Sequence, residues 1–390
     1  MKNNMKYNFD ETAKRINTSS IKWDVKENEL PMWVADMDFL MMPEIQEAVV
    51  KASQDNCFGY TYPTKEFFQA YQSWWSTRHH IDIDTSWMIF SSGVVSALDS
   101  IVRALTKEGD GIMVLSPVYH VFHNVIRNNN RKVVKSSLLK ECDDYSINYQ
   151  DVEKQFKNNN VRALIFCNPH NPVGRIWQKE EIKQLSDLCE KYNVLFISDE
   201  IHCDIVDPGY EYCSALSVND SCIVCLSPGK AFNLAGVHSA VVVVKDEQKR
   251  KKLQEAFYHD DIGEPNYFAI PTNVAAYTKG AEYVNQLNQY LFENKRYVSS
   301  FIQEKMPQVR LVSGHATYLL WLDVSSLKTR SDKLVEELRK QTGLILSPGI
   351  QFGEEGSYFV RMNIATSLKN IKDAMKRFKQ YVDLKEKENA

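Results

Sequence analysis

Two residues of this sequence could carry acid–base or nucleophilic chemistry, because each closely follows a short apolar run. Asp199 comes after the run 194–197, and Lys230 comes after the run 223–226, in a turn of small residues. A carboxylate at the end of a buried strand needs a partner, and a suitably placed lysine can form a Schiff base with a carbonyl compound. A structural salt bridge at Asp199 and an ordinary surface-loop lysine at Lys230 are the alternative interpretations.

Three further segments follow apolar runs in the same way and could bind a ligand. The small-residue turn 91–95 enters a predicted helix, where free backbone N–H groups suit a phosphate, although such a turn is more often an ordinary helix cap. Tyr119 lies after the run 111–115 and opens the next helix. The loop 167–174 contains two Asn-Pro steps, which force a rigid, non-helical path and place Asn171 beyond the end of a strand.

Together these segments form the constellation that pyridoxal 5′-phosphate (PLP) chemistry requires. That cofactor needs a lysine for its Schiff base and an acidic partner for its pyridine nitrogen. Lys230 and Asp199 supply those two groups, the turn 91–95 supplies a phosphate cup, and Tyr119 and Asn171 supply a stacking ring and a polar contact. The sequence therefore predicts a PLP site.

The elements that must position these residues alternate between short apolar runs and amphipathic helical patterns. Such alternation predicts a parallel sheet covered by helices on both faces, an α/β fold. Ligands of open α/β sheets bind beyond the carboxyl ends of the strands, where the residues above are found. Strands are expected at 87–90, 111–115, 161–166, 194–197, 223–226 and 240–244, and helices at 93–105, 119–127 and 179–192.

The pattern changes after about residue 282, where a long helical stretch precedes short strands mixed with helices. We therefore expect a large domain at 46–285 and a smaller α+β domain at 286–390. The aromatic- and proline-rich segment 1–45 is expected to pack on either domain or on a second subunit, and the charged tail 383–390 to fray. The expected elements of the smaller domain are helices at 283–304, 332–341 and 367–382 and strands at 310–312, 318–322 and 358–363.

Over nearly its whole length the chain resembles the fold-type-I PLP-dependent enzymes of the class I/II aminotransferase superfamily. Asn-Pro-x-Asn-Pro-x-Gly at 168–174, with Ser-x-x-Lys at 227–230, carries that resemblance. The segments 33–39 (WVADMDF) and 198–202 (SDEIH) point to the branch of cystathionine β-lyases and cysteine C–S lyases, the cystalysin-like group. The resemblance implies PLP as the cofactor and a large domain whose mostly parallel, seven-stranded sheet is sandwiched by helices. Further matching segments are 30–32, 59–61, 175–177, 231–236 and 359–363.

The resemblance also implies a role for each matching residue. Lys230 would form the Schiff base and move the substrate's Cα proton, and Asp199 would keep the pyridine nitrogen protonated. Asn171 would donate to the phenolic oxygen of the ring and border the substrate, and Arg361 would clamp the substrate carboxylate bidentately. The remaining cofactor contacts would come from Tyr119, the amides of Val94 and Val95, Ser227, His202, and Tyr60 of a neighbouring subunit, with Tyr119 or Tyr60 as a possible proton donor beside Lys230.

Two positions depart from the aminotransferase pattern. His202 stands three residues after Asp199, where many aminotransferases carry tyrosine, and it matches the lyase-like branch. His238 stands eight residues after Lys230, where many carry a phosphate-binding arginine. The charge partner of the phosphate is therefore open: His238 could serve, and a packed strand histidine is the alternative.

Composition and motifs argue against several other classes of protein. The 47 Lys and Arg nearly balance the 50 Asp and Glu, so the basic excess of a nucleic-acid binder is missing. No apolar run approaches the length of a membrane span, and the polar start does not resemble a signal peptide. The eight scattered cysteines are expected to be reduced thiols in the cytoplasm. We expect no metal site, because Cys222-x-x-Cys225 lies in an apolar strand with no second ligand pair.

These observations predict an enzyme that acts on a small-molecule amino acid. The leading hypothesis is β-elimination: cleavage of the C–S bond of L-cystathionine or a related cysteine S-conjugate to thiol, pyruvate and ammonia. An aminotransferase would use the same residues and is the first alternative; the branch resemblance, His202 and His238 favour the lyase. A regulatory protein that binds a transcription factor, a second role found in the lyase branch, is another alternative and could coexist with catalysis. The reach of Tyr60 implies a homodimer with shared active sites.

Overall fold

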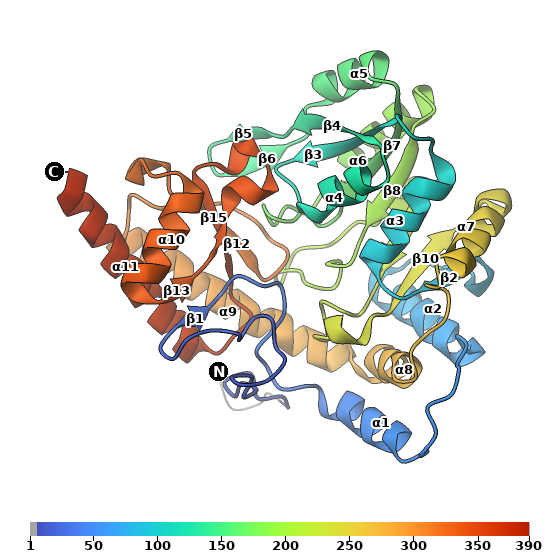
Figure 1. The fold of residues 1–390 in the computed structure, drawn as a ribbon, viewed down its shortest axis with the longest axis horizontal. Coiled ribbons are helices and arrows are strands. Elements are labelled where there is room, and N and C mark those ends of the chain that lie inside the picture. Colours follow the sequence, from blue (N-terminus) through green and yellow to red (C-terminus); the bar gives the residue numbers. More distant parts are fainter. Residues whose placement is uncertain (1–5, 390) are drawn as a thin grey trace.

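The computed structural model describes residues 6–389, and its centre is one seven-stranded sheet (Figure 1). Strand β10 is antiparallel to both of its neighbours, and the other neighbouring pairs are parallel. The predicted α/β fold with a mostly parallel, seven-stranded sheet is therefore confirmed. Across the sheet the order is β2 (Met88–Ser91), β10 (Ala240–Val244), β9 (Ile223–Leu226), β8 (Leu195–Asp199), β7 (Val161–Cys167), β3 (Gly111–Ser116) and β4 (Lys132–Ser137).

Helices cover both faces of this sheet because alternate strand residues point to opposite sides. Ile112 and Val114 of β3 belong to one buried core, and Met113 and Leu115 of the same strand belong to the other. Continuous apolar strands are what a sheet buried on both faces requires. The first core is closed by α3 (Val94–Leu105), α4 (Val121–Asn128) and α7 (Glu247–His259), and the second by α2 (Lys65–His79), α5 (Tyr149–Asn158), α6 (Lys179–Lys191) and α8 (Ala269–Lys279), with α1 (Pro43–Ser53) packed on α8.

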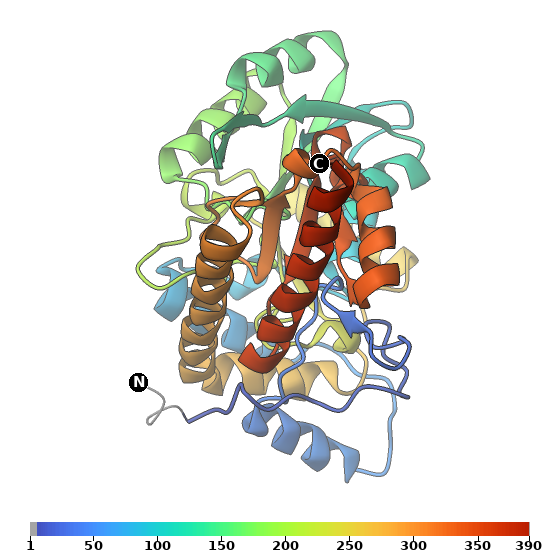
Figure 2. The same ribbon diagram turned by 90° about the vertical axis from the view of Figure 1, so that its left-hand side faces the viewer.

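The C-terminal part of the chain forms a second, antiparallel sheet of four strands. Its order is β11 (Arg310–Leu311), β12 (Leu319–Asp323), β15 (Phe359–Asn363) and β14 (Ser347–Pro348). Three helices accompany it: α9 (Ala281–Lys305), α10 (Ser331–Thr342) and α11 (Leu368–Asn389). Figure 2 shows α9 and α11 lying beside each other on this side of the molecule. We propose, as the sequence predicted, that the larger unit gives way to the smaller near residue 285, within α9.

The expectation that the charged tail frays is wrong for residues 383–389, because α11 continues through them. Lys385 forms ion pairs with Glu337 of α10 at 2.8 Å and with Glu388 at 2.8 Å. Charged pairs one turn apart stabilise an exposed helix end, and the contact with α10 adds a tertiary tie. Ala390 lies outside the described residues.

The N-terminal segment runs back to the C-terminal elements. Strand β1 (Leu30–Pro31) pairs in parallel with β13 (Leu344–Ile345), and the ring of Phe9 packs against Phe39 and Tyr290 of α9. The other short elements are the strand pair β5 (Leu139–Glu141) and β6 (Asp144–Ser146) and the 3-10 helices η1 (Thr85–Trp87), η2 (Ala215–Ser217), η3 (Ala235–Val237), η4 (Ser325–Leu327), η5 (Gly349–Phe352) and η6 (Glu354–Gly356). Within residues 6–389, no helix combines the length and the apolar character that crossing a membrane requires.

Candidate active site

A cavity of about 280 Å³ lies beyond the carboxyl ends of β7, β8 and β9, where the first turn of α3 closes it. This is the position at which open α/β sheets bind ligands. The lining brings together side chains that are far apart in the sequence. Of the predicted site residues, Val94, Val95, Tyr119, Asn171, Asp199, His202, Ser227 and Lys230 line the cavity, as does His238.

Lys230 follows β9 in a tight turn and enters the cavity as a free amine. Its Nζ donates a hydrogen bond to the backbone carbonyl of Ala35 at 2.8 Å. Burial, with a smaller contribution from the charge of Arg361, lowers the pKa of Lys230 to about 8, against the opposing charges of Asp36 and Asp199. A substantial share of the amine is therefore neutral near physiological pH, as attack on a carbonyl carbon requires.

Asp199 is the last residue of β8 and is buried. Burial raises the pKa of Asp199 to about 7, although its Oδ1 accepts a hydrogen bond from the Ile201 amide at 3.1 Å and Lys230 is nearby. A carboxyl group with so few partners will ionise readily once a cation arrives beside it. A protonated pyridine nitrogen is such a cation.

Arg361 on β15 connects the second sheet to the cavity. Its Nη1 donates to Oδ1 of Asn171 at 3.1 Å and its Nη2 donates to the Trp33 carbonyl at 2.9 Å, while its buried Nε has no partner among residues 6–389. The guanidinium lies 4.7 Å from the ring centre of Phe352. Burial lowers the pKa of Arg361 to about 10, so the side chain remains a cation at neutral pH and can bind a carboxylate.

The N-terminus of α3 forms an amide cradle at one end of the cavity. Gly93, with φ of 146°, brings the chain into the helix, and no side chain caps it. The amides of Val94 and Val95 lie in the first turn and so lack an intrahelical acceptor, which suits a phosphate. Ser227 also lines this cavity, but its hydroxyl donates to the Ser239 carbonyl at 2.7 Å and accepts from the Gly229 amide at 3.0 Å.

Two histidines differ strongly in their surroundings. His202 is buried, its Nδ1 has no partner within the described chain, and burial together with the charges of Lys230 and Arg361 lowers its pKa well below the usual value. His238 is exposed at the end of η3 with φ of 52° and lines the cavity. The alternative of a packed strand histidine is therefore wrong for His238, which is free to face an anion.

Tyr119 and Tyr60 occupy different regions. Tyr119 follows β3 on the cavity wall, its amide donates to the Asn171 carbonyl at 3.1 Å, and burial raises the pKa of its phenol. Tyr60 does not line this cavity: it is 99% exposed and borders a separate hollow of about 820 Å³ beside α1 and α8. A single chain therefore does not bring Tyr60 to Lys230.

Sequence reasoning missed the backbone that holds the reactive side chains. The carbonyls of Trp33 and Ala35 accept from Arg361 and Lys230, and the Tyr318 hydroxyl donates to Ala35 at 3.0 Å. Backbone carbonyls carry no sequence signal of their own. The motif 33–39, which contains Trp33 and Ala35, is the sequence signal that could have indicated these contacts, but here it supports only the family resemblance.

The residues present fit PLP. The cavity offers an amine for the aldehyde, a buried carboxyl for the pyridine nitrogen, an aromatic wall, and an amide cradle for the phosphate. Three polar groups of the site still lack full partners: His202 Nδ1, Arg361 Nε and the Asp199 carboxyl, for which only the Ile201 amide contact is seen in residues 6–389. Buried polar groups are normally satisfied, so their incomplete pairing indicates space reserved for a ligand.

The fold and this site define a class of protein, and the comparison of sequences agrees. The pattern of the family "Aminotransferase class I and II" matches residues 28–378. The chain therefore belongs to that family, and the resemblance stated from its motifs is confirmed.

Within the family, several of the similar proteins carry lyase names, and a PLP-bound putative aminotransferase from Clostridium difficile 630 also matches, with a TM-score of 0.94 and 36% identity over 96% of this chain and 100% of that one. The chain is 34% identical to cystathionine beta-lyase PatB of Bacillus subtilis (strain 168), and the match covers 95% of this chain and 99% of the relative. Cystalysin from Treponema denticola, which contains PLP, matches with a TM-score of 0.93 and 32% identity over 97% of this chain and 99% of that one. The PLP-bound C–S lyase from Staphylococcus hominis matches with a TM-score of 0.91 and 29% identity over 97% and 98%.

Proposed function

We propose that this protein is a PLP-dependent C–S lyase that cleaves L-cystathionine or a related cysteine S-conjugate into a thiol, pyruvate and ammonia. The observation that carries the proposal is that Lys230, Asp199 and Asn171 line one cavity, and that Arg361, outside this lining, donates a hydrogen bond to Asn171. The similarity to cystathionine beta-lyase PatB over nearly the full length of both chains supports the choice of reaction.

The substrate's position follows from the groups around the cavity. Arg361, held by Asn171 and the Trp33 carbonyl, presents its guanidinium to the substrate carboxylate. Burial excludes water around this cation, which strengthens its attraction for the carboxylate. The substrate's Cα is thereby brought toward Lys230.

PLP, when bound, supplies the electron sink that makes the Cα proton removable. The Lys230 amine, with its pKa near 8, accepts that proton at Nζ and is directed by the Ala35 carbonyl. Asp199 holds a proton at the pyridine nitrogen, and the ring of Tyr119 forms one wall for the cofactor. The sulfur leaves from Cβ, and protonated Lys230 or the Tyr119 hydroxyl can give it a proton.

An aminotransferase would use the same residues, so the products decide between the two. Purified protein loaded with PLP is incubated with L-cystathionine and no keto acid. The lyase releases pyruvate, ammonia and homocysteine in equal amounts over many turnovers, and K230A serves as the inactive control. If no pyruvate forms and turnover begins only when a keto acid is added, the proposed function is wrong.

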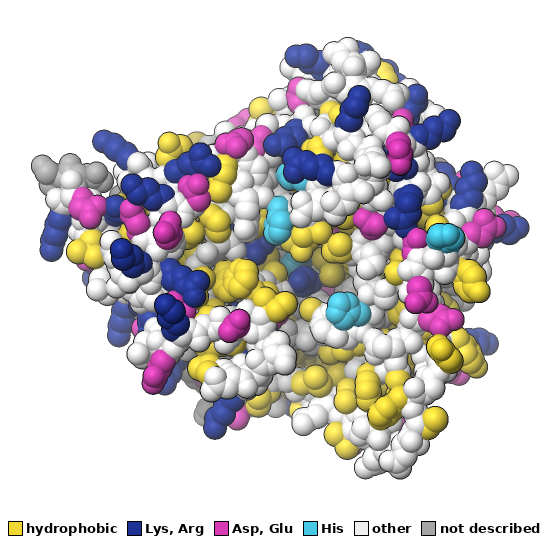
Figure 3. All heavy atoms as spheres, viewed as in Figure 1, with side chains coloured by type: hydrophobic (Ala, Val, Ile, Leu, Met, Phe, Trp, Pro, Cys, Tyr) yellow, Lys and Arg dark blue, Asp and Glu magenta, His cyan; other side chains and the backbone are white. Residues whose placement is uncertain are grey.

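We propose further that the protein is a homodimer in which Tyr60 completes the partner's site. Support comes from its exposure, its distance from the cavity lining, and the hydrophobic side chains gathered over α1 and α8 (Figure 3). Mixing inactive Tyr60→Ala and Lys230→Ala protomers would then regenerate one complete site in each hybrid dimer, or about a quarter of wild-type activity after random exchange. A mixture that stays inactive although sedimentation shows hybrid dimers would refute the shared site.

We also propose that the protein works in the cytoplasm. All eight cysteines are free thiols, and six of them are buried or partly buried. Free thiols in such numbers are typical of a reducing compartment. Fractionation of the source cells with an antibody to the protein tests this, and recovery outside the cytoplasmic fraction would contradict it.

A further inference from the structure

Residues 33–37, which we call the strap, pass beside the cavity: Ala35 lines it, and the carbonyls of Trp33 and Ala35 accept from Arg361 and Lys230. Each carbonyl of the strap accepts at least one side-chain hydrogen bond. The donors are Arg361 and Ser347 to Trp33, Asn363 to Val34, Lys230 and Tyr318 to Ala35, Asn363 and Lys22 to Asp36, and Asn233 and Arg15 to Met37. The strap is therefore a fixed main-chain platform, and the Lys230 amine rests on its middle carbonyl.

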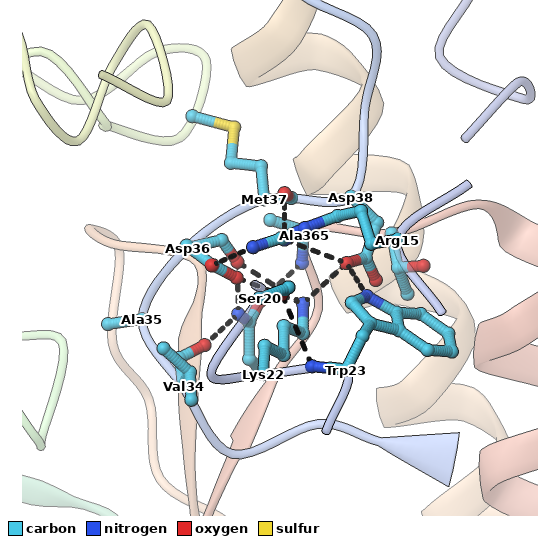
Figure 4. A network of polar contacts seen from close by, with 12 residues as sticks. Arg15, Ser20, Lys22, Trp23, Val34, Ala35, Asp36, Met37, Asp38 and Ala365 are labelled. Atoms are coloured by element: carbon cyan, nitrogen blue, oxygen red, sulfur yellow. Dashed lines mark hydrogen bonds and ion pairs between the residues drawn. The ribbon is translucent and has the colours of Figure 1, made fainter. Parts of the chain in front are cut away.

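A buried ion pair lies against one end of this platform (Figure 4). The Lys22 side chain is 1% exposed, and its Nζ lies 3.0 Å from Asp38 Oδ1 and 3.6 Å from Asp36 Oδ1. Asp38 is 1% exposed and also accepts from the Trp23 indole N–H at 2.8 Å. Arg15 adds an ion pair with Asp36 at 2.6 Å. The pair therefore connects segment 15–23 to the strap.

The two ends of the strap share Asn363 and otherwise have different partners. At the first end, the Met32 amide donates to the Ile345 carbonyl at 2.9 Å, and the Asn363 amide donates to the Met32 carbonyl at 2.9 Å. That end carries the Trp33 carbonyl, which accepts from Arg361. The second end is held by Arg15, Lys22, Asn233 and the Asn363 side chain. Lys22 contacts the strap at Asp36, so a disturbance at Lys22 should affect Lys230 more than Arg361.

Lys22 is connected to the charge around the Lys230 amine through Asp36. The charged or titratable groups that act on Lys230 are Asp36, Asp199 and Arg361, and His202 is close enough to be influenced by it. Asp36 favours the protonated amine, and Lys22 and Arg15 offset the charge of Asp36. Without Lys22, the negative charge beside Lys230 would be larger.

We propose that Lys22 and Asp38 are positioning residues for the Lys230 amine: their buried ion pair fixes the strap, and the Ala35 carbonyl of the strap directs that amine. The inference rests on the proposed function, because it concerns how Lys230 is prepared for proton transfer. Burying an ion pair costs desolvation energy that apolar side chains would not. The ion pair can hold the Ala35 carbonyl at a defined place beside the reactive amine, and apolar side chains could not do so.

The test is a pH titration of the visible absorbance of the PLP-loaded protein, in which the cofactor reports the protonation of the nitrogen of Lys230. Lys22→Met removes the cation and should raise the midpoint by about half a pH unit or more. Asp38→Asn removes a carboxylate that pairs with both Lys22 and Arg15, so these two cations then offset Asp36 alone and the midpoint should fall. The double variant should return close to the wild-type midpoint. Turnover of cystathionine by Lys22→Met should lose about tenfold in kcat, with KM within about twofold of wild type, because Arg361 keeps its own support.

Lys251→Met is the matched control, because it breaks an exposed ion pair with Glu247 and changes the net charge equally. A midpoint and a kcat of Lys22→Met equal to those of Lys251→Met would overturn the proposal. Trp23→Phe, which removes the indole N–H donor to Asp38 together with part of the ring, gives the same comparison if Lys22→Met does not fold. If wild type itself shows no absorbance from cofactor bound to Lys230, the proposed function fails first. If wild type shows the absorbance and the turnover expected, but the variants have the same midpoint and kcat as wild type, this inference is wrong and the proposed function stands.

Discussion

Asp199 and Glu200 are adjacent in the chain and both are buried, yet their surroundings are opposite. Glu200 accepts from Ser198, Ser214, Tyr212 and the Ala215 amide, with the Asn168 amide at 3.4 Å. Asp199 accepts from the Ile201 amide and otherwise borders the cavity. Successive residues of extended backbone face opposite sides, so one step beyond the end of β8 separates the two environments.

The difference teaches how a buried carboxyl can be assigned to structure or to chemistry. A carboxylate surrounded by donors is satisfied by the protein and stabilises the fold. A carboxyl left short of donors is held ready for a ligand that brings the missing charge. The cavity side of the molecule should therefore tolerate substitution without unfolding but lose activity, and the Glu200 side should do the reverse.

The largest expected effect lies on the cavity side. Lys230→Ala should lower C–S cleavage by at least about a thousandfold, because it removes both the amine that binds the cofactor and the base that takes the Cα proton. The melting temperature of the cofactor-free protein should not fall, since a desolvated amine is removed. Pyruvate release and thermal melts measure the two quantities. Full turnover by this variant would refute the site assignment.

Asp199→Asn should have the next largest effect. The amide cannot hold a proton on the pyridine nitrogen, and we expect about a hundredfold loss of kcat. The free energy of unfolding of the cofactor-free protein should stay the same or rise, because a poorly paired carboxyl is replaced by a neutral group. Steady-state kinetics and urea unfolding check this. A stability loss with normal kcat would reverse the roles given to Asp199 and Glu200.

Glu200→Gln should give the opposite pattern. It replaces a carboxylate that is saturated with donors, and should cost about 2 kcal/mol of unfolding free energy. The kcat of the folded, PLP-loaded enzyme should change little, because Glu200 does not line the cavity. Urea unfolding of Glu200→Gln and Asp199→Asn, measured side by side, compares their free energies of unfolding. Unchanged stability with a large loss of kcat would place Glu200 in the chemistry.

The pH dependence of stability tests the same comparison through a slope rather than through a single substitution. The pKa of Asp199 in the folded, cofactor-free protein is about 7, above that of an unfolded chain. Below about pH 4 the carboxyl is protonated in both states. Between about pH 4 and 7 the unfolded chain releases the proton and the folded chain keeps it, so stability falls as pH rises, by at most about 1.4 kcal/mol per pH unit.

Asp199→Asn is the matched control for that slope, since the amide does not titrate. The difference in unfolding free energy between wild type and Asp199→Asn should decline from pH 4 to pH 7 and then level off. Unfolding of both cofactor-free proteins across this range measures it. A constant difference would mean that the pKa of Asp199 is ordinary and that the carboxyl has partners beyond Ile201.

Six strands of the large sheet could be predicted from sequence because they are buried on both faces, whereas the edge strand β4, which is partly exposed, has no continuous apolar run. The runs 223–226 and 240–244 coincide with β9 and β10, since continuous apolar residues have sharp boundaries. The pairs β1–β13 and β14–β15 could not be predicted in this way. β1, β13 and β14 have two residues each and exist through tertiary pairing rather than through any local pattern.

The candidate site was predictable where side chains follow strands. Asp199, Asn171 and Lys230 were chosen by position after apolar runs, and the structure brings them to one cavity. The role of the Ala35 carbonyl and the exposed turn of His238 could not be predicted from the sequence, because main-chain contacts and φ angles depend on the assembled fold. Tyr60 stays a prediction about a second subunit.

The pairing of β1 with β13 has a consequence for synthesis of the protein. Leu30 meets Leu344, so the segment that leads into the strap must wait for a partner about 300 residues later. At ribosomal rates of about 5–20 residues per second, that wait lasts about 15–60 seconds. The nascent chain can complete its central sheet while Lys230 still lacks its carbonyl platform. Placing the Ala35 carbonyl beside Lys230 would then be a late event, which follows the assembly of the cavity residues 94–238.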